Sequence, residues 1–288
     1  MPSATGRPTR EIKHLSDLDD QWLLRTHFFG LYREEEDGTL VLPNPQKQNE
    51  VLPADTINEA IQAAIDALED NLQVSIRTYE QREEFHDYDR DLWNEYSMMD
   101  LDKYPVIKVH SLTLQYGEGS DAQVLWEVPS SMLQIHGQAS LFGTLQILPQ
   151  VGAYMGANGV NPLLFSGILN ANFAPSFFKV VYDAGLDGLP SDPKRDALPS
   201  SIVRAIGLQA AIHPLNILGD LQIGAGIASM SVSVDGISRS VNTTASAENS
   251  AFSSRIIQYH KELRGDQNTQ GLIPSLQAKW RRVPMALL

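Results

Sequence analysis

The chain of 288 residues contains no cysteine. Disulfide bonds, thiolate nucleophiles and cysteine-ligated zinc sites are therefore excluded. Residues 1–10 also lack the apolar run of about 7–15 residues that a secretory signal needs. We therefore expect a soluble protein of the cytosol.

Positive charge is scarce. There are 22 Lys and Arg residues against 35 Asp and Glu residues, which gives a formal net charge of −13. Wrapping DNA requires clustered Lys and Arg that displace counterions, and the body of the chain has no such cluster. An acidic surface would instead let DNA slide past without being held.

The segment 128–178 contains no charged residue over 51 consecutive positions, although 20% of the chain is charged. It is not a membrane span, because prolines and asparagines break every apolar run well short of about 18–20 residues. An uncharged segment rich in Gly, Asn, Leu, Ile and Phe is typical of surface that meets other protein. This segment favours an assembly subunit over an enzyme.

A long helix is predicted from about Ala54 to Phe85. Thr56 and Glu59 have the spacing of a capping box. Apolar residues recur every three or four positions and form one stripe along the helix: Ile57, Ile61, Ile65, Leu68, Leu72 and Ile76. Nine acids against two arginines follow between Glu80 and Asp102, with aromatic residues interleaved.

Strand patterns begin after this acidic segment. Alternating and β-type residues predict strands over 106–116, 123–128, 132–136, 141–148 and 177–182. Helical patterns return over 202–212 and 250–263, with a second apolar segment over 215–227 and a short strand over 230–234. His213-Pro214 is expected to end or kink the first of these helices, and Gly265 to stop the last.

The known catalytic and metal-binding motifs are incomplete in this chain. Asp87, Asp89 and Asp91 have the spacing that begins a calcium loop, but Leu92 and Met98 stand where that loop needs Gly and Glu. The glycines at 224 and 226 are followed by Ser229 and a strand pattern, which does not fit a dinucleotide site. The glycines at 152, 156 and 159 have no Lys-Ser/Thr partner, so they form no phosphate loop.

The histidines and the remaining acids give no site either. No histidine pair has the HExxH or a similar ligand spacing. Asp183, Asp187, Asp192 and Asp196 could act as an acid–base pair, but they lie among Gly and Pro residues typical of a loop. We therefore expect no enzyme activity and no cofactor.

One ordered set of motifs is informative. The set consists of Tyr182-Asp-Ala-Gly185, Leu189-Pro190, the helix pattern 199–211 with its Ala-Ala pair, Val232-Ser-Val-Asp235-Gly236-Ile-Ser238, and the helix pattern 253–263 with Arg255-Ile. This order resembles the head–tail connector (adaptor) proteins of tailed bacteriophages. The resemblance covers roughly residues 177–265, and the predicted helix over 57–76 is a further candidate member of the same core.

The resemblance implies a helical connector core, and the strand patterns add a β module to it. Together they predict an α+β fold: a helical connector core with an inserted β-strand module and extended N- and C-terminal arms. The expected divisions are an N-terminal arm and loop (1–53), a helical core (54–104 plus 177–265), an inserted β module with the uncharged loop (105–176), and a C-terminal docking tail (266–288). The family's simplest members lack such a β module.

The resemblance also implies a function and partners. The chain is expected to be a virion protein of the neck, at the head–tail junction, assembled in the host cytoplasm. Its expected partners are the portal protein, copies of itself in a dodecameric ring, the next neck or tail-terminator ring, and double-stranded DNA passing through without sequence-specific binding. No membrane is expected.

Two groups of residues are candidates for these contacts. The candidates for portal docking are Leu276, Lys279, Trp280, Arg281 and Arg282, because aromatic and arginine anchors are enriched at interface centres. The candidates for an acidic channel lining are Glu83, Glu84, Asp87, Asp89 and Asp91. The alternatives are another tail or baseplate subunit, or a β-sandwich carbohydrate-active protein that uses the Asp-rich loop 183–196.

Overall fold

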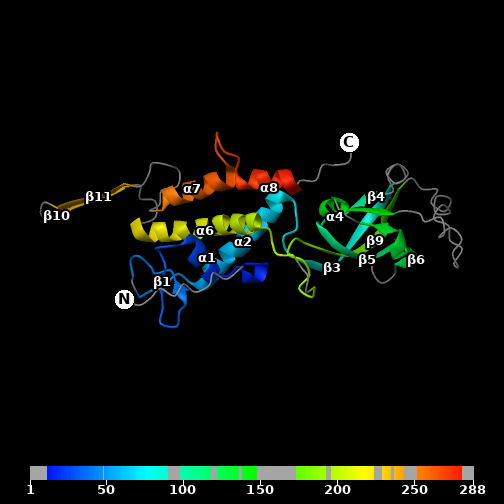
Figure 1. Cartoon of the computed structure of the whole chain (residues 1–288), viewed down its shortest axis with the longest axis horizontal. Helices are drawn as coiled ribbons and strands as arrows, with labels where there is room; N and C mark the ends of the chain where they lie inside the picture. Colours follow the sequence, from blue (N-terminus) through cyan, green and yellow to red (C-terminus); the bar gives the residue numbers. More distant parts are fainter. Residues whose placement is uncertain are drawn as a thin grey trace. The chain divides into compact units, whose positions relative to one another are not determined.

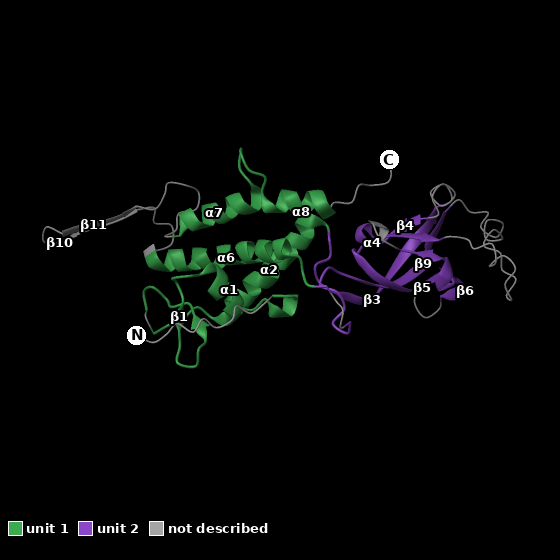
Figure 2. Cartoon of the chain, in the orientation of Figure 1, with its two compact units in different colours: residues 1–73, 197–281 green, residues 74–196, 282–288 purple. Residues whose placement is uncertain are grey.

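The structure is a computed structural model. It describes residues 12–47, 49–89, 98–117, 122–135, 138–147, 173–192, 196–223, 229–234, 237–242 and 252–280. The chain divides into two compact units (Figures 1 and 2): residues 1–73 with 197–281 form unit 1, and residues 74–196 with 282–288 form unit 2. The expected divisions at 53, 104 and 176 therefore do not coincide with those of the structure.

Unit 1 is helical. Its helices are α1 (Asp20–His27), α2 (Ala54–Leu72), α6 (Ser200–Ile223), α7 (Ser253–Arg264) and α8 (Leu272–Trp280), with a 3-10 turn η1 (Leu15–Asp17) and a short hairpin of β1 (Arg33–Glu34) and β2 (Leu40–Val41). The longest helix, α6, contacts α1, α2, α7 and α8. The core of this unit is therefore built around α6.

Helix α2 follows the predicted apolar stripe, because Ile57, Ile61, Ile65, Leu68 and Leu72 are all buried. The helix begins at Ala54 as predicted, but the predicted capping box and the predicted end at Phe85 were wrong. Pro53 is the N-cap residue and no side chain caps the helix. At the other end Gln73 adopts a left-handed conformation with φ of 56°, which stops the helix at Leu72.

Helix α6 does not end at His213-Pro214, where the sequence predicts an end or a kink. Proline removes one backbone N–H and clashes with the preceding turn, yet Pro214 lies inside the helix and is buried. Apolar residues on both sides of the proline, among them Ile206, Ala211 and Leu215, are fully buried against the rest of unit 1. This packing on both sides of Pro214 outweighs the local cost of the proline.

The N-terminal segment contributes to the core of unit 1. Leu23 and Leu24 of α1 and the following Phe28 are at most 1% exposed, and α1 contacts both α2 and α6. Residues 12–53, expected to form an arm and a loop, therefore pack in part on the helical unit. Residues 1–11 lie outside the described part of the chain.

Unit 2 contains two antiparallel sheets. The larger has the order β3-β9-β5-β6, formed by β3 (Tyr79–Asp89), β9 (Phe173–Ala184), β5 (Val106–Tyr116) and β6 (Gln123–Glu127). The smaller has the order β4-β8-β7, formed by β4 (Met98–Asp100), β8 (Thr144–Ile147) and β7 (Leu133–Gln134). A 3-10 turn η3 (Ser130–Met132) and a short helix α4 (Gln138–Phe142) complete the described part of the unit.

Residues 79–89 are a strand, although the sequence pattern predicted helix as far as Phe85. The strand pairs with β9 from Tyr79↔Ala184 to Asp89↔Phe173. A helix over the same residues would have left the edge of β9 without this partner. Conversely, the predicted strand over 141–148 is shorter than expected, because α4 occupies residues up to Phe142 and β8 begins at Thr144.

The uncharged segment 128–178 divides into two parts. Val128, Met132, Leu145, Phe177 and Phe178 belong to the hydrophobic core of unit 2. The absence of charge in these stretches therefore has an internal cause, since a core position excludes unpaired charge. Residues 148–172 lie outside the described part of the chain.

A two-stranded hairpin lies between α6 and α7 in the chain. Strands β10 (Ser229–Val234) and β11 (Ile237–Asn242) pair in register from Ser229↔Asn242 to Val234↔Ile237. The separation of helices and antiparallel strands into two units confirms the α+β class.

Candidate functional site

The acidic strand β3 does not present all its acids to solvent. Successive side chains in a strand point to opposite faces, so Glu83, Phe85 and Asp87 are exposed while Glu84 is buried. Glu83 forms an ion pair with Lys179 at 2.8 Å, and the Lys179 ammonium lies 5.9 Å from the centre of the Phe85 ring. Asp87 accepts a hydrogen bond from the backbone N–H of Ser176 at 2.8 Å.

Glu84 is thus wrongly placed in the predicted acidic face, because its side chain is only 5% exposed. Its Oε1 accepts a hydrogen bond of 2.9 Å from the backbone N–H of Asp102. The Tyr182 hydroxyl also donates to Glu84 and accepts from the N–H of Lys103 at 3.0 Å. Nε2 of His86 lies 3.5 Å from Oε2 of Glu84. The cluster joins β3, β9 and the segment after β4.

Burial and hydrogen bonding act in opposite directions on this cluster. Burial pushes the pKa of Glu84 upward, but its polar interactions with His86, Tyr182 and Asp102 outweigh burial and hold that pKa below its ordinary value. Burial, followed by the hydrogen bond with Glu84, raises the pKa of Asp102. Burial and the bond to Glu84 likewise raise the pKa of Tyr182. The surroundings therefore favour the charged form of Glu84 and the neutral forms of Asp102 and Tyr182.

The Asp-rich loop, expected as the site of a carbohydrate-active protein, begins with buried structural groups. Asp183 is 3% exposed, and its Oδ2 lies 2.7 Å from Nε2 of His110 on β5. Its Oδ1 accepts a hydrogen bond of 2.8 Å from the N–H of Gln81. The two oxygens of Asp183 thus bridge β9 to both neighbouring strands, where the pairing is irregular. Asp187 is also buried, so these two acids are not an exposed acid–base pair.

The Tyr-Asp-Ala-Gly motif has a steric reason for its glycine. Gly185 has φ of +129°, and a Cβ there would overlap the carbonyl oxygen of Arg77. Its N–H donates to the carbonyl of Pro105 at 2.9 Å. At the start of the motif, the Tyr182 side chain is fully buried. The motif therefore fixes the end of β9, from which the chain leads back to unit 1.

The predicted portal-docking residues differ in their exposure: two are buried, one is exposed, and two lie outside the described part of the chain. Leu276 is 3% and Trp280 is 7% exposed, because α8 packs against α2, α6 and α7. The amide of Gln277 also donates to the carbonyl of Asn71 at 2.8 Å. Lys279 is exposed, while Arg281 and Arg282 lie outside the described part of the chain. Leu276 and Trp280 therefore serve the core of unit 1 and do not form an open docking surface.

A half-buried histidine, which the sequence analysis missed, joins three helices of unit 1. A Cβ on Gly207 of α6 would overlap Nε2 of His27. The His27 ring meets the rings of Trp22 and Tyr259 edge-on at 6.0 and 5.9 Å, and the Tyr259 hydroxyl donates to the His27 carbonyl at 3.1 Å. Burial, followed by the charge of Arg204, lowers the pKa of His27 to about 4. His27 is therefore neutral at pH 7.

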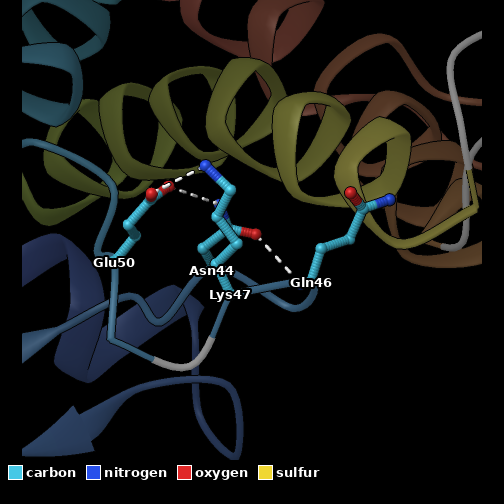
Figure 3. Close-up of polar contacts among 4 residues, drawn as sticks. All are labelled: Asn44, Gln46, Lys47 and Glu50. Atoms are coloured by element: carbon cyan, nitrogen blue, oxygen red, sulfur yellow. Dashed lines mark hydrogen bonds and ion pairs between the residues drawn. The ribbon is translucent and has the colours of Figure 1, made fainter.

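A small polar loop closes next to β2 (Figure 3). The Lys47 ammonium and the Glu50 carboxylate are 2.7 Å apart, and the Asn44 amide donates to Glu50 at 3.3 Å. The Asn44 side-chain oxygen accepts from the N–H of Gln46. All four residues are exposed or half-buried, so the contacts shape the loop and add little stability.

The described residues contain no candidate metal cluster and one helix that is long and apolar enough to cross a membrane. No group of three or more His, Asp and Glu side chains in that part of the chain is placed to hold a metal ion. Asp87 and Asp89 lie on strand β3, and Asp91 lies outside the described residues. The apolar helix is Ser200–Gln222 of α6, and 61% of its most apolar 18-residue window is buried inside the protein, as in the core helix of a soluble protein.

The sequence gives little indication that His27 and Glu84 belong to clusters of interacting residues. His27 lies within an apolar run, and Glu84 is one of nine acids in a single segment. The period of two in β3 separates Glu84 from Glu83, but that period becomes visible only once the segment is known to be a strand.

Solved structures similar to this chain include two neck assemblies. One is "Neck of empty GTA particle computed with C6 symmetry", with 17% identity, a TM-score of 0.34, and coverage of 56% of this chain and 66% of that chain. Another is "Neck of native GTA particle computed with C12 symmetry", with 17% identity, a TM-score of 0.37, and coverage of 80% and 84%. This chain thus spans slightly less than two thirds of the former. Both TM-scores lie below 0.5, so neither establishes a shared fold.

No protein-family model matches the chain, and no curated protein matches it.

Proposed function

We propose that this chain is a virion structural protein: a head-to-tail adaptor that forms a ring under the portal, continues the DNA channel and joins the head to the tail. The observation that carries the proposal is the ordered set of connector-like motifs over residues 177–265. In the structure these motifs comprise the end of β9, the central helix α6, part of the β10–β11 hairpin, and α7.

The placement of the motifs supports this proposal physically. Gly185 is required by the close approach of Arg77, and α6 organises the whole of unit 1 through its contacts with the other four helices. The motifs thus occupy positions on which the end of β9 in unit 2 and the helix packing of unit 1 depend. Their proposed role is docking and assembly, because helices that are well packed on one side hold their exposed side rigid.

In this proposal the portal binds basic residues near the end of the chain. These are fewer than the five residues that the sequence predicted. Lys279, Arg281 and Arg282 are the candidates, since Leu276 and Trp280 are buried in unit 1. Reversing the charge of these three residues is expected to weaken binding to purified portal. Reversing the exposed cations Lys13, Arg33 and Lys47 is the matched control and should leave portal binding unchanged.

The proposed lining of the DNA conduit consists of Glu83, Asp87 and Asp89 on β3, together with Asp91, which lies outside the described part of the chain. A wall of carboxylates repels phosphate and lets the duplex move without being trapped. Replacing these acids with lysine should slow genome ejection. If ejection and packaging both stayed normal, the lining would lie elsewhere.

The location of the protein in the particle tests the proposed function directly. An epitope-tagged copy would be labelled with gold in particles from a lysate and viewed by negative-stain microscopy. Label at the head–tail junction is the expected result. Label at the distal tail would make the chain a baseplate subunit, and label absent from the particles would overturn the structural function.

A further inference from the structure

The outer face of α7 is basic in an acidic protein. Ile256 and Leu263 face the core and are at most 1% exposed, whereas Ser254, Gln258, Lys261 and Arg264 are exposed. The spacing of the exposed residues, at intervals of three and four, places them on one stripe. This stripe, called the α7 basic face below, has two cations and no acid.

The acids nearest to this stripe are already engaged. Glu262, the only acid on α7, forms an ion pair with Arg204 of α6. Asp266, just after the helix, accepts hydrogen bonds of 2.9 Å from the N–H groups of Asn268 and Thr269 within its own turn. Asp266 also interacts electrostatically with Lys261. The two cations of the α7 basic face outnumber this one acid, so the face remains positive for a partner outside this helix.

The outer face of α2 has the opposite charge. Its exposed acids recur at helical spacing and are Asp55, Glu59, Asp66 and Asp70. Helix α2 contains no Lys, Arg or His at all. Like charges four residues apart, such as Asp55 with Glu59 and Asp66 with Asp70, disfavour the helix. A cationic surface placed against this face would offset that repulsion.

The two faces belong to one helical unit. Both α2 and α7 pack on α6, and in Figure 1 helix α7 lies above α6 with the first turns of α2 below it. A subunit that carries two different complementary faces makes head-to-tail contacts with its neighbours, and such contacts form a ring when the rotation closes.

We propose that the α7 basic face of one copy docks on the acidic face of α2 in a second copy of this chain. The inference rests on the proposed ring function and names its lateral contact. The charges select this pairing of faces, because a contact between the α2 faces of two copies would bring acids together.

Cross-linking between introduced thiols tests the contact. The chain has no cysteine, so a Lys261→Cys chain mixed with a Glu59→Cys chain can be joined by a short bis-maleimide only at the chosen sites. Because each chain carries one thiol, an intramolecular contact gives no product. We expect a covalent dimer of the two chains, with a yield about tenfold above that for Lys261→Cys mixed with Glu36→Cys, an exposed acid elsewhere in unit 1.

Charge reversal provides the second measurement. Adding the substitutions Asp55→Lys and Asp66→Lys to the Glu59→Cys chain should lower the yield about tenfold. Adding Arg264→Glu to the Lys261→Cys chain should restore part of the yield with that partner. Equal yields with Glu59→Cys and Glu36→Cys, or no response to charge reversal, would overturn the proposal.

The two tests fail independently. Specific cross-links together with gold label at the distal tail would keep the lateral contact and overturn the neck function. Label at the head–tail junction without specific cross-links would keep the neck function and overturn this contact.

Discussion

The two units enclose an ionisable group in opposite ways. In unit 1 the His27 ring lies among Trp22, Tyr259 and the surface of α6 at Gly207, with a cation nearby, so it is kept neutral. In unit 2 Glu84 is buried, but donors from three segments surround it and keep it charged. Burial alone therefore does not decide whether a group is charged; the neighbouring donors do.

The largest expected loss of stability is that of Glu84→Ala, and it should far exceed that of the neighbouring Glu83→Ala. Glu84→Ala should destabilise unit 2 by about 3–4 kcal/mol, because the donors around the carboxylate are left buried without an acceptor. Hydrogen exchange of the β3, β5 and β9 amides under increasing denaturant would measure the loss.

Glu83→Ala is the matched control, one residue away on the outer face of the same strand. It should change the free energy of unfolding by less than about 1 kcal/mol, since exposed ion pairs contribute little. Equal effects of the two substitutions would mean that the donor cluster does not support Glu84.

Acidification should affect unit 1 first. The pKa of His27 is about 4 in the folded chain against roughly 6.5 when unfolded. The unfolded state therefore takes up the proton first as the pH falls, and stability is lost between about pH 6.5 and pH 4 and stays constant above that window. We expect a loss of about 2–3 kcal/mol by pH 4, measured by hydrogen exchange of α1 and α6.

His27→Gln tests the origin of this loss, because glutamine does not titrate. The variant should be less stable than the natural chain at pH 7 but lose less stability on acidification. In unit 2 the lowered pKa of Glu84 means that stability is lost only at a pH below the ordinary titration range of a glutamate. The raised pKa of Asp102 offsets part of this loss of stability. Simultaneous loss in both units at about pH 6 would contradict the comparison.

Gly207→Ala should have an intermediate effect on unit 1. The added Cβ overlaps the His27 ring, so the ring or α1 must move. Overpacking of this kind costs about 1–3 kcal/mol. Thermal unfolding would measure the loss, and combining Gly207→Ala with His27→Ala should recover part of it if the overlap is the cause.

The smallest expected effect is at the surface of unit 2. Lys179→Met keeps the apolar stem over Phe85 and removes the ion pair with Glu83. The free energy of unfolding should fall by no more than about 0.5 kcal/mol and should become less sensitive to salt. Chemical denaturation at low and high ionic strength measures both quantities.

The sequence by itself determined the helical stripe of α2, the long strand β5 over residues 106–116, and the helix that ends before Gly265. In each case the apolar period agrees with the local propensity over about ten residues or more, so no distant partner is needed to choose the structure. The same reasoning identified the α+β class, because strand and helix patterns separate along the chain.

Only the tertiary structure decided the acidic segment and the end of the chain. Residues 79–89 have charges at successive positions and no clear apolar period, so pairing with β9 selected the strand and with it the burial of Glu84. The apolar residues of α8 fit a core as well as a docking surface, and packing on α2, α6 and α7 selected the core. Where local patterns are ambiguous, the partner that removes apolar surface from water and satisfies backbone hydrogen bonds makes the choice.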